Sequence, residues 1–237
     1  MLDNDAMRQL AVDLLWADTE QEVIATLEKV DLWRDSTAWR LYGDLEGNYA
    51  TIGNQQSRPE AALVEKIVNS VDARLMNECI CCGIDPVSAD APQSIRAAVA
   101  RFFENRELHG DIGGTIDGWT RDRRLEQSQY ITVAATGGRQ APSLTVADCG
   151  EGQTPSKMPE TLLSIHRTNK LKIPFVQGKF NMGATGVLKF GAENRLQFVI
   201  SRRNPAIMKD AAECREDDHH WGFTIIRRER PTEQAAR

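Results

Sequence analysis

The residues best suited to chemistry begin at Asp148, which follows the apolar pair Val146 and Ala147 and opens the run Asp-Cys-Gly-Glu-Gly. This pattern predicts a carboxylate at the end of a buried strand, where it can accept a hydrogen bond from an exocyclic amine such as that of adenine. Gly150 and Gly152 lack a Cβ atom and would let the backbone approach a flat ring. Because Asp and Gly are also ordinary turn residues, a turn without a ligand is the alternative for this run taken alone.

A second polar group is predicted on a helix over residues 59–76, whose composition favours helix formation. Glu65, Asn69 and Asp72 lie four and three residues apart, so they form one row along that helix. A carboxylate one turn before a carboxamide is unusual for a solvated face, although an amphipathic helix with a chance Glu and Asn has the same pattern. The neighbouring apolar row is expected to face the core: Val64, Ile67, Val68, Val71 and Leu75.

Glycines are concentrated after residue 177, ahead of an apolar segment that reads as a helix start. Backbone N–H groups in such a loop, together with the positive end of a helix, are suited to holding phosphate groups. Lys170 and Lys179 would add positive charge there. The P-loop pattern is absent, and a flexible surface loop is the alternative. The glycines are Gly178, Gly183, Gly186 and Gly191.

The elements that must position these groups are predicted from hydrophobic periodicity. Residues 130–135 and 143–148 indicate a hairpin that turns at Gly137 and Gly138, with Asp148 at the end of its second strand. Residues 196–201 and 223–228 are expected to supply the last strands. Residues 93–105 predict an amphipathic helix with four inward side chains, Ile95, Val99, Phe102 and Phe103.

The chain before residue 59 is predicted to begin with a helix over residues 3–31, broken near Asp18, where Thr19 caps a second piece. This helical part is expected either to pack against the sheet or to reach across to a second copy. Its apolar row consists of Leu10, Leu14, Leu15, Val23, Leu27 and Val30.

Composition excludes several classes of protein. A net charge of −5 over 237 residues argues against a basic nucleic-acid clamp. No apolar run approaches the roughly 18 residues that span a bilayer, and the acidic N-terminus lacks a signal-peptide core, so a cytoplasmic location is expected. Five cysteines do not suggest a disulfide framework. Reduced thiols and surface histidines are expected, with a metal site as the alternative, at Cys79, Cys81, Cys82, Cys214, His219 and His220.

In the order in which they occur along the chain, the polar row of the helix over residues 59–76, the run after Asp148 and the glycine-rich segment resemble the GHKL ATPase superfamily. This superfamily includes gyrase B subunits, ninety-kilodalton heat-shock chaperones, histidine kinases, MutL and the related MORC proteins. The resemblance covers about residues 60 to 230. Each motif alone is weak, whereas their order and spacing together are specific. The motifs are Glu65-x3-Asn69-Ser-x-Asp72-Ala73, Asp148-Cys-Gly150-Glu-Gly152, Thr168-Asn-Lys170 and the loop from Gly178 to Gly186.

The resemblance implies a Bergerat fold of the α/β type, an α+β two-layer sandwich. In this fold a mixed, mostly antiparallel sheet has helices on one face, and ATP lies between the helices and the sheet. The ATP-binding domain would cover residues 59–230, preceded by an N-terminal helical extension over residues 1–58. Residues 231–237 would be a tail that leads to a C-terminal region missing from this chain.

The resemblance also implies the roles of individual residues. Glu65 would polarise the attacking water, Asn69 would hold Mg²⁺, and Asp148 would receive the adenine amine. The loop from Gly178 to Gly186 would cradle phosphate and close as a lid, although its glycine spacing departs from the family pattern G-x-x-G-x-G. Thr224 is displaced by one position from the threonine that the family places near adenine. The implied ATP contacts are Asn69, Asp72, Ala73, Asp148, Gly150, Gly152, Thr168, Lys170, Gly178, Lys179, Gly183, Ala184, Thr185, Gly186 and Thr224.

The implied activity is Mg²⁺-dependent ATP hydrolysis, weak in an isolated domain, with the nucleotide state controlling lid closure and homodimerisation of a larger protein. No histidine precedes His109, which argues against an autokinase. The MORC-like branch implies a DNA-associated or phage-defence ATPase, with DNA or an effector protein bound through regions outside this chain. The alternative is a nucleotide-sensing or protein-interaction module with the same fold and negligible hydrolysis.

Overall fold

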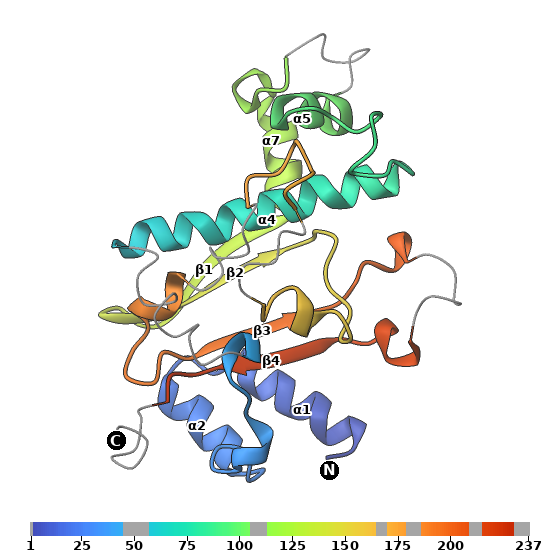
Figure 1. Ribbon diagram of the computed structural model, residues 1–237. Coiled ribbons are helices and arrows are strands. Elements are labelled where there is room, and N and C mark those ends of the chain that lie inside the picture. Colours follow the sequence, from blue (N-terminus) through green and yellow to red (C-terminus); the bar gives the residue numbers. More distant parts are fainter. Residues whose placement is uncertain are drawn as a thin grey trace.

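The computed structural model describes residues 2–44, 57–104, 113–164, 170–178, 186–208 and 215–229, and these combine helices with two small antiparallel sheets. The architecture is therefore α+β. Figure 1 shows the long helix α4 (Pro59–Cys81) above the strands, and α1 (Asn4–Leu15) and α2 (Glu20–Glu28) below them. Short 3-10 turns connect the larger elements: η1 (Ser36–Ala38), η2 (Tyr42–Asp44), η3 (Ile116–Gly118), η4 (Met158–Glu160), η5 (Gly186–Phe190), η6 (Pro205–Ile207) and η7 (Glu216–His219).

Helix α4 organises the main core. Pro59 suits its first turn, because the N–H group that proline lacks has no partner within a helix at that position. Its second half is buried together with α5 (Ile95–Phe103), which Ser94 caps by accepting a hydrogen bond from the N–H of Ala97. The buried cluster consists of Leu75, Met76, Cys79, Ala91, Ala98, Phe103, Trp119, Ile173, Phe175 and Val176.

The predicted apolar row of α4 is wrong at Val64, whose side chain is 55% exposed. The α4 side chains in or against the core cluster begin at Val71, so the first turns of the helix extend beyond the residues that bury the second half. The inward helix over residues 93–105 is confirmed as α5 for the described residues. Phe103 is buried there, and Ile95, Val99 and Phe102 are partly buried against the cluster.

The predicted hairpin is confirmed as β1 (Ile131–Gly138) and β2 (Ala141–Asp148), with Ile131 opposite Asp148. Its turn is not at Gly137 and Gly138, because Gly138 still pairs with Ala141 and only two residues connect the strands. Along the chain, α7 (Arg121–Ser128) leads into β1.

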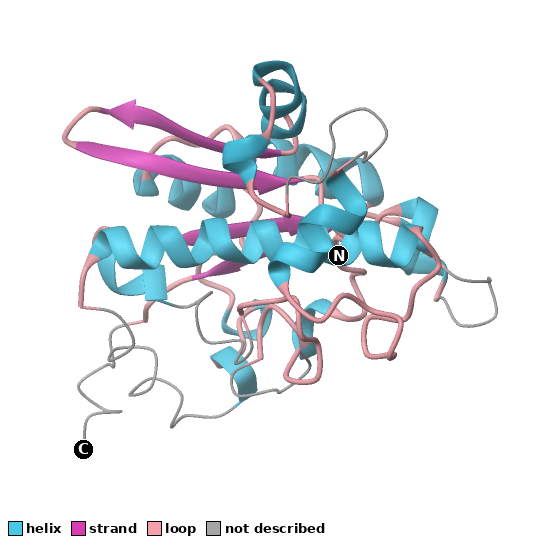
Figure 2. Ribbon diagram, turned by 90° about the horizontal axis from the view of Figure 1, so that it is seen from above, coloured by secondary structure: helices cyan, strands magenta, loops and turns pink. Residues whose placement is uncertain are grey.

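The prediction that β2 is a buried strand is wrong. Only Ser143 and Val146 of β2 are partly buried, and the remaining residues are exposed. The hairpin pairs with no further described strand, and Figure 2 shows it projecting beside α4. Neither face of β2 is therefore covered along its length.

The second sheet pairs β3 (Gln197–Ser201) with β4 (Gly222–Ile226), close to the last strands that the sequence predicts. The break in the N-terminal helix is also confirmed: Thr19 accepts from the N–H of Glu22, whose carboxylate accepts from the N–H of Thr19. Helices α1 and α2 pack on this sheet through Leu10, Leu14 and Leu27, together with Phe198, Phe223 and Ile225. The apolar row thus has an intramolecular partner.

Leu15 is the exception in that row, because its side chain is 49% exposed. It is the last residue of α1, and it is rotated about 100° around the helix axis from the buried Leu14. The cluster against β3 and β4 therefore uses Leu14 and leaves Leu15 outside.

Two polar contacts fasten the N-terminal helices to the second sheet. The Glu20 carboxylate accepts hydrogen bonds from the backbone N–H groups of Asn194, at 2.9 Å, and Leu196, at 3.4 Å. After β4, the Arg227 guanidinium lies 4.5 Å from the ring centroid of Trp33 and 3.7 Å from that of Trp39. The helices before residue 45 are therefore part of the same packed structure as β3 and β4.

The strand arrangement differs from the single mixed sheet with helices on one face that the resemblance implies. Within the described ranges the strands form two separate pairs, and helices lie above the first pair and below the second. A hydrogen bond connects the segment after β2 to the last residue of β3: the N–H of Gln153 donates to Ser201 Oγ at 2.9 Å. No helix in the described part of the chain is both long and apolar enough to cross a membrane.

Candidate functional site

Asp148 lies at the end of β2 with its carboxylate held from two sides. Its Oδ2 atom accepts a hydrogen bond from the hydroxyl of Ser70 on α4 at 2.8 Å, and its Oδ1 atom accepts from the N–H of Gly150 at 3.0 Å. Ser70 is buried, whereas Asp148 is exposed. Each carboxylate oxygen has a second lone pair, so the group can accept another hydrogen bond from a ligand.

The two glycines after Asp148 are required by packing of the protein against itself. A Cβ atom on Gly150 would lie 2.5 Å from the Cβ of Ala73. At the next residue, the N–H of Glu151 donates to the Ala73 carbonyl at 3.1 Å. Gly152 has a φ of +63°, and a Cβ there would lie 1.8 Å from the Arg202 carbonyl oxygen. The sequence predicted that these glycines make room for a ring, and the geometry adds a different reason for them.

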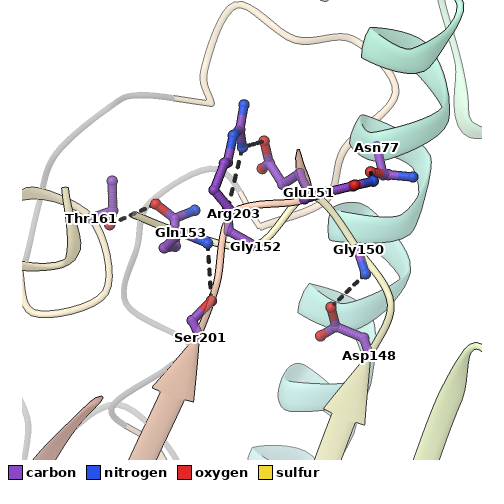
Figure 3. A network of polar contacts seen from close by, with 10 residues as sticks. Asn77, Asp148, Gly150, Glu151, Gly152, Gln153, Thr161, Ser201 and Arg203 are labelled. Carbon is purple, nitrogen blue, oxygen red and sulfur yellow. Dashed lines mark hydrogen bonds and ion pairs between the residues drawn. The ribbon is translucent and has the colours of Figure 1, made fainter. Parts of the chain in front are cut away.

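Figure 3 shows a polar network around this turn. The buried Glu151 carboxylate forms an ion pair with Arg203 at 2.7 Å, and the side chain of Asn204 donates to Asn77 Oδ1 at 2.7 Å. The side-chain carbonyl of Gln153 accepts from the Thr161 hydroxyl at 3.0 Å. These residues link the ends of β2 and β3 to α4, and sequence reasoning missed all of them.

Asp72 is fully buried and anchors the start of the glycine-rich segment. Its carboxylate accepts from the N–H of Gln177 at 3.0 Å and from the N–H of Gly178 at 2.7 Å. The resemblance implies an ATP contact for Asp72. In the structure its oxygens bind backbone N–H groups, so any effect on a ligand passes through the segment that Asp72 holds.

Asn69 lies beside that anchored segment. A Cβ on Gly178 would lie 2.5 Å from Asn69 Oδ1, so a larger residue there would require the Asn69 side chain to move. Glu65 is one turn earlier on α4, and both side chains are half-buried. An amide oxygen is a ligand type that Mg²⁺ accepts, and a nearby carboxylate can orient water, so the residues present fit the implied Mg²⁺.

The remaining predicted contacts are placed as follows. Gly186 is buried at the start of η5, which contacts α4. Lys170 is half-buried in a turn. Thr224 lies on β4 opposite Val199. Its strand neighbours Phe223 and Ile225 pack toward α1 and α2, so the Thr224 side chain lies on the other face of the strand. Outside the described residues are Thr168, Lys179, Gly183, Ala184 and Thr185.

Lys66 is a further charged residue of α4 that the sequence did not single out. It is half-buried and lies one turn before Ser70 on the same face of the helix. Burial lowers the pKa of the Lys66 ammonium from 10.5 to about 8, and the neighbouring Glu65 charge opposes this only in part. The Lys66 ammonium is therefore held on α4 at an energetic cost.

The free energy of unfolding is expected to rise as the pH increases from about 8 to about 10.5, because in that window the unfolded chain keeps the Lys66 proton and the folded chain releases it. After allowing for partial exposure, the rise should be on the order of 2 kcal/mol. Urea denaturation across this range should show that Lys66→Met removes the rise. The exposed Lys157 provides the control, since Lys157→Met should keep the rise in the free energy of unfolding. The same dependence of this free energy on pH in all three proteins would contradict the role of Lys66.

Other features of the described surface add no residue to the candidate site around Asp148 and α4. One surface hollow is lined by residues that include Thr120 and Arg123, and a second by residues that include Ala97 and Arg101. Neither hollow is lined by Glu65, Asn69, Asp72 or Asp148. Within the described residues, no set of three His, Cys, Asp or Glu side chains could hold a metal ion, and the free cysteines are Cys79, Cys81, Cys82 and Cys149.

Comparisons with protein-family models, with curated proteins and with solved structures find no match to this chain.

Proposed function

We propose that this chain is an ATP-binding domain of the GHKL type, with a Bergerat fold, that hydrolyses ATP with Mg²⁺ and whose nucleotide state controls lid closure and dimerisation of a larger protein. One observation carries the proposal. The turn after Asp148 and the start of the glycine-rich segment at Gly178 both contact the stretch of α4 from Asn69 to Ala73. Two stretches that are distant in sequence thus contact the polar row of one helix, and this supports the proposal.

The chemistry available to these residues suits phosphoryl transfer, which depends on positioning and charge neutralisation. Asp148 would accept the exocyclic amine of adenine. The Asn69 amide oxygen would hold Mg²⁺, which would supply positive charge to offset that of the phosphates. Glu65 would orient the attacking water. The segment that Asp72 anchors at Gly178 would lead into the phosphate loop.

Dimerisation in this proposal must use surfaces other than the main apolar row of the N-terminal helices. Leu10, Leu14 and Leu27 are already buried against the β3–β4 sheet. A MORC-like association with DNA, or with an effector protein, would involve parts of the larger protein outside this chain. Light scattering should show a rise in mass on adding a non-hydrolysable ATP analogue if the nucleotide drives dimerisation.

Titration calorimetry with a non-hydrolysable ATP analogue tests the proposal directly. We expect binding in the presence of MgCl₂ and markedly weaker binding when EDTA removes the metal. Absence of binding with Mg²⁺ present would reject the nucleotide site. Binding that is the same with and without Mg²⁺ would reject the role of Asn69 as a metal ligand.

The variant Glu65→Ala should bind the ATP analogue about as well as the wild type but lose turnover by at least about 100-fold, because it removes the group that orients water. Phosphate release measures turnover, and it should be repeated in the full-length protein. Glu60, an exposed carboxylate on the first turn of α4, provides the control, since Glu60→Ala should change neither quantity. Wild-type hydrolysis no faster than that of Glu65→Ala would instead favour a nucleotide-sensing module.

A further inference from the structure

The turn after β2 is held by an ion pair that reaches across from the end of β3. Arg203 Nη1 lies 2.7 Å from the carboxylate of Glu151 and also donates to the Gly152 carbonyl at 3.2 Å. The two side chains are 24% and 11% exposed, so this pair is largely removed from water. Removing one partner would leave a mostly buried charge without compensation.

Backbone contacts bring the same two segments together. The N–H of Asn204 donates to the Glu151 carbonyl at 3.0 Å, and the Arg202 carbonyl lies against the glycine at position 152. The Asn204 side chain in turn donates to Asn77 on α4. Three consecutive residues after β3, Arg202 to Asn204, therefore contact the turn or α4.

On its other side the same turn is joined to Asp148 and to α4. The N–H of Gly150 donates to Asp148, and the N–H of Glu151 donates to the Ala73 carbonyl. Glu151 thus donates its N–H to α4, whereas its carbonyl and its carboxylate both accept hydrogen bonds from residues after β3. The direction of the Gly150 N–H group, and with it one of the two bonds that orient Asp148, depends on how Glu151 is held.

We propose that Arg203 is a positioning residue that sets the presentation of the Asp148 carboxylate through Glu151 and Gly150, without touching a ligand itself. The positioning follows from the contacts of the chain alone. Its consequence for adenine affinity rests on the proposed function. The effect should appear at the base end of a nucleotide, so adenosine without phosphates is the suitable probe.

The variant Arg203→Met tests this in two ways. In the ligand-free protein, amide hydrogen exchange followed by NMR should accelerate about tenfold or more at Gly150 and Glu151, because the hydrogen bonds that these N–H groups donate then open more readily. Adenosine affinity measured by calorimetry should fall about tenfold, at a temperature where the protein stays folded. Arg203→Lys keeps the charge and should recover part of both effects.

Arg123 offers a matched control. Its side chain is also 24% exposed, it forms an ion pair with Glu126, and it donates to the Phe103 carbonyl, but it lies on α7. Arg123→Met should lower thermal stability while leaving exchange at Gly150 and Glu151 and adenosine affinity within about twofold of the wild type.

The outcomes separate this inference from the proposed function. Unchanged exchange at Gly150 and Glu151 in Arg203→Met would overturn the positioning role, whatever the protein binds. Faster exchange with unchanged adenosine affinity would overturn its link to the ligand. A wild type that binds neither adenosine nor the ATP analogue with Mg²⁺ would reject the proposed function and the link to affinity, while the exchange result would still decide whether Arg203 positions the turn.

Discussion

Replacing Asp72 by alanine is expected to lower the free energy of unfolding by about 3 kcal/mol. The Asp72 carboxylate is fully buried and accepts hydrogen bonds from the backbone N–H groups of Gln177 and Gly178. Alanine leaves both donors without this partner and opens a small cavity between α4 and the glycine-rich segment. Urea denaturation should show the loss as a lower midpoint with an unchanged slope.

Two further variants define the cause of that loss. Asn in place of Asp72 keeps one acceptor oxygen, so Asp72→Asn should cost roughly half as much as Asp72→Ala. Asp85 is exposed and accepts from the N–H of Val87 at 3.1 Å, so Asp85→Ala should cost less than about 1 kcal/mol. Equal losses for Asp72→Ala and Asp85→Ala would show that burial of the carboxylate contributes little.

The parts of the fold that sequence reasoning predicted depend on short-range signals. Thr19 and Glu22 are three residues apart and form a capping box, so the break between α1 and α2 could be read directly. The hairpin that ends at Asp148 and the polar row of α4 follow from periods of two and of three to four residues. In each case the interacting residues lie within about one turn of a helix or on neighbouring strands.

Burial was predicted less well, because it depends on what packs against an element. Val64 continues the apolar row of α4, yet it extends beyond the core cluster. Val146 and its neighbours read as a buried strand, but β2 has only β1 as a partner among the described strands. Periodicity shows which residues share a face, and it does not show whether another element covers that face.

The polar contacts that shape the candidate site were largely out of reach of sequence reasoning. Asp72 binds the N–H of Gln177 across 105 residues, and Glu151 binds Arg203 across 52. A lone Glu between two glycines, or an Arg after a strand, carries no signal that identifies its partner. Sequence motifs therefore singled out Asp148, Asn69 and Glu65 as candidates, whereas the partners of Asp72 and Glu151 could be seen only in the structure.

The largest expected effect on binding is that of Asp148→Asn, which should weaken ATP binding by about 100-fold. The carboxylate already accepts from Ser70 and Gly150 and retains acceptor capacity for the exocyclic amine of adenine. Asparagine keeps one oxygen, which Gly150 can use, and presents an NH₂ group that cannot accept from an amine. Because the Ser70 hydroxyl can rotate to accept from that NH₂ group, the turn should stay folded, and thermal unfolding should change little.

A nucleotide whose purine lacks the exocyclic amine separates this recognition from general damage to the site. The wild type should bind that analogue about 100-fold more weakly than ATP, whereas Asp148→Asn should bind both with similar low affinity, as titration calorimetry can measure. Ser70→Ala removes only the support at Oδ2 and should weaken ATP binding by about tenfold or less while keeping the preference for the amine. If Asp148→Asn still preferred ATP over the analogue, the base would be recognised elsewhere and Asp148 would lose its proposed role.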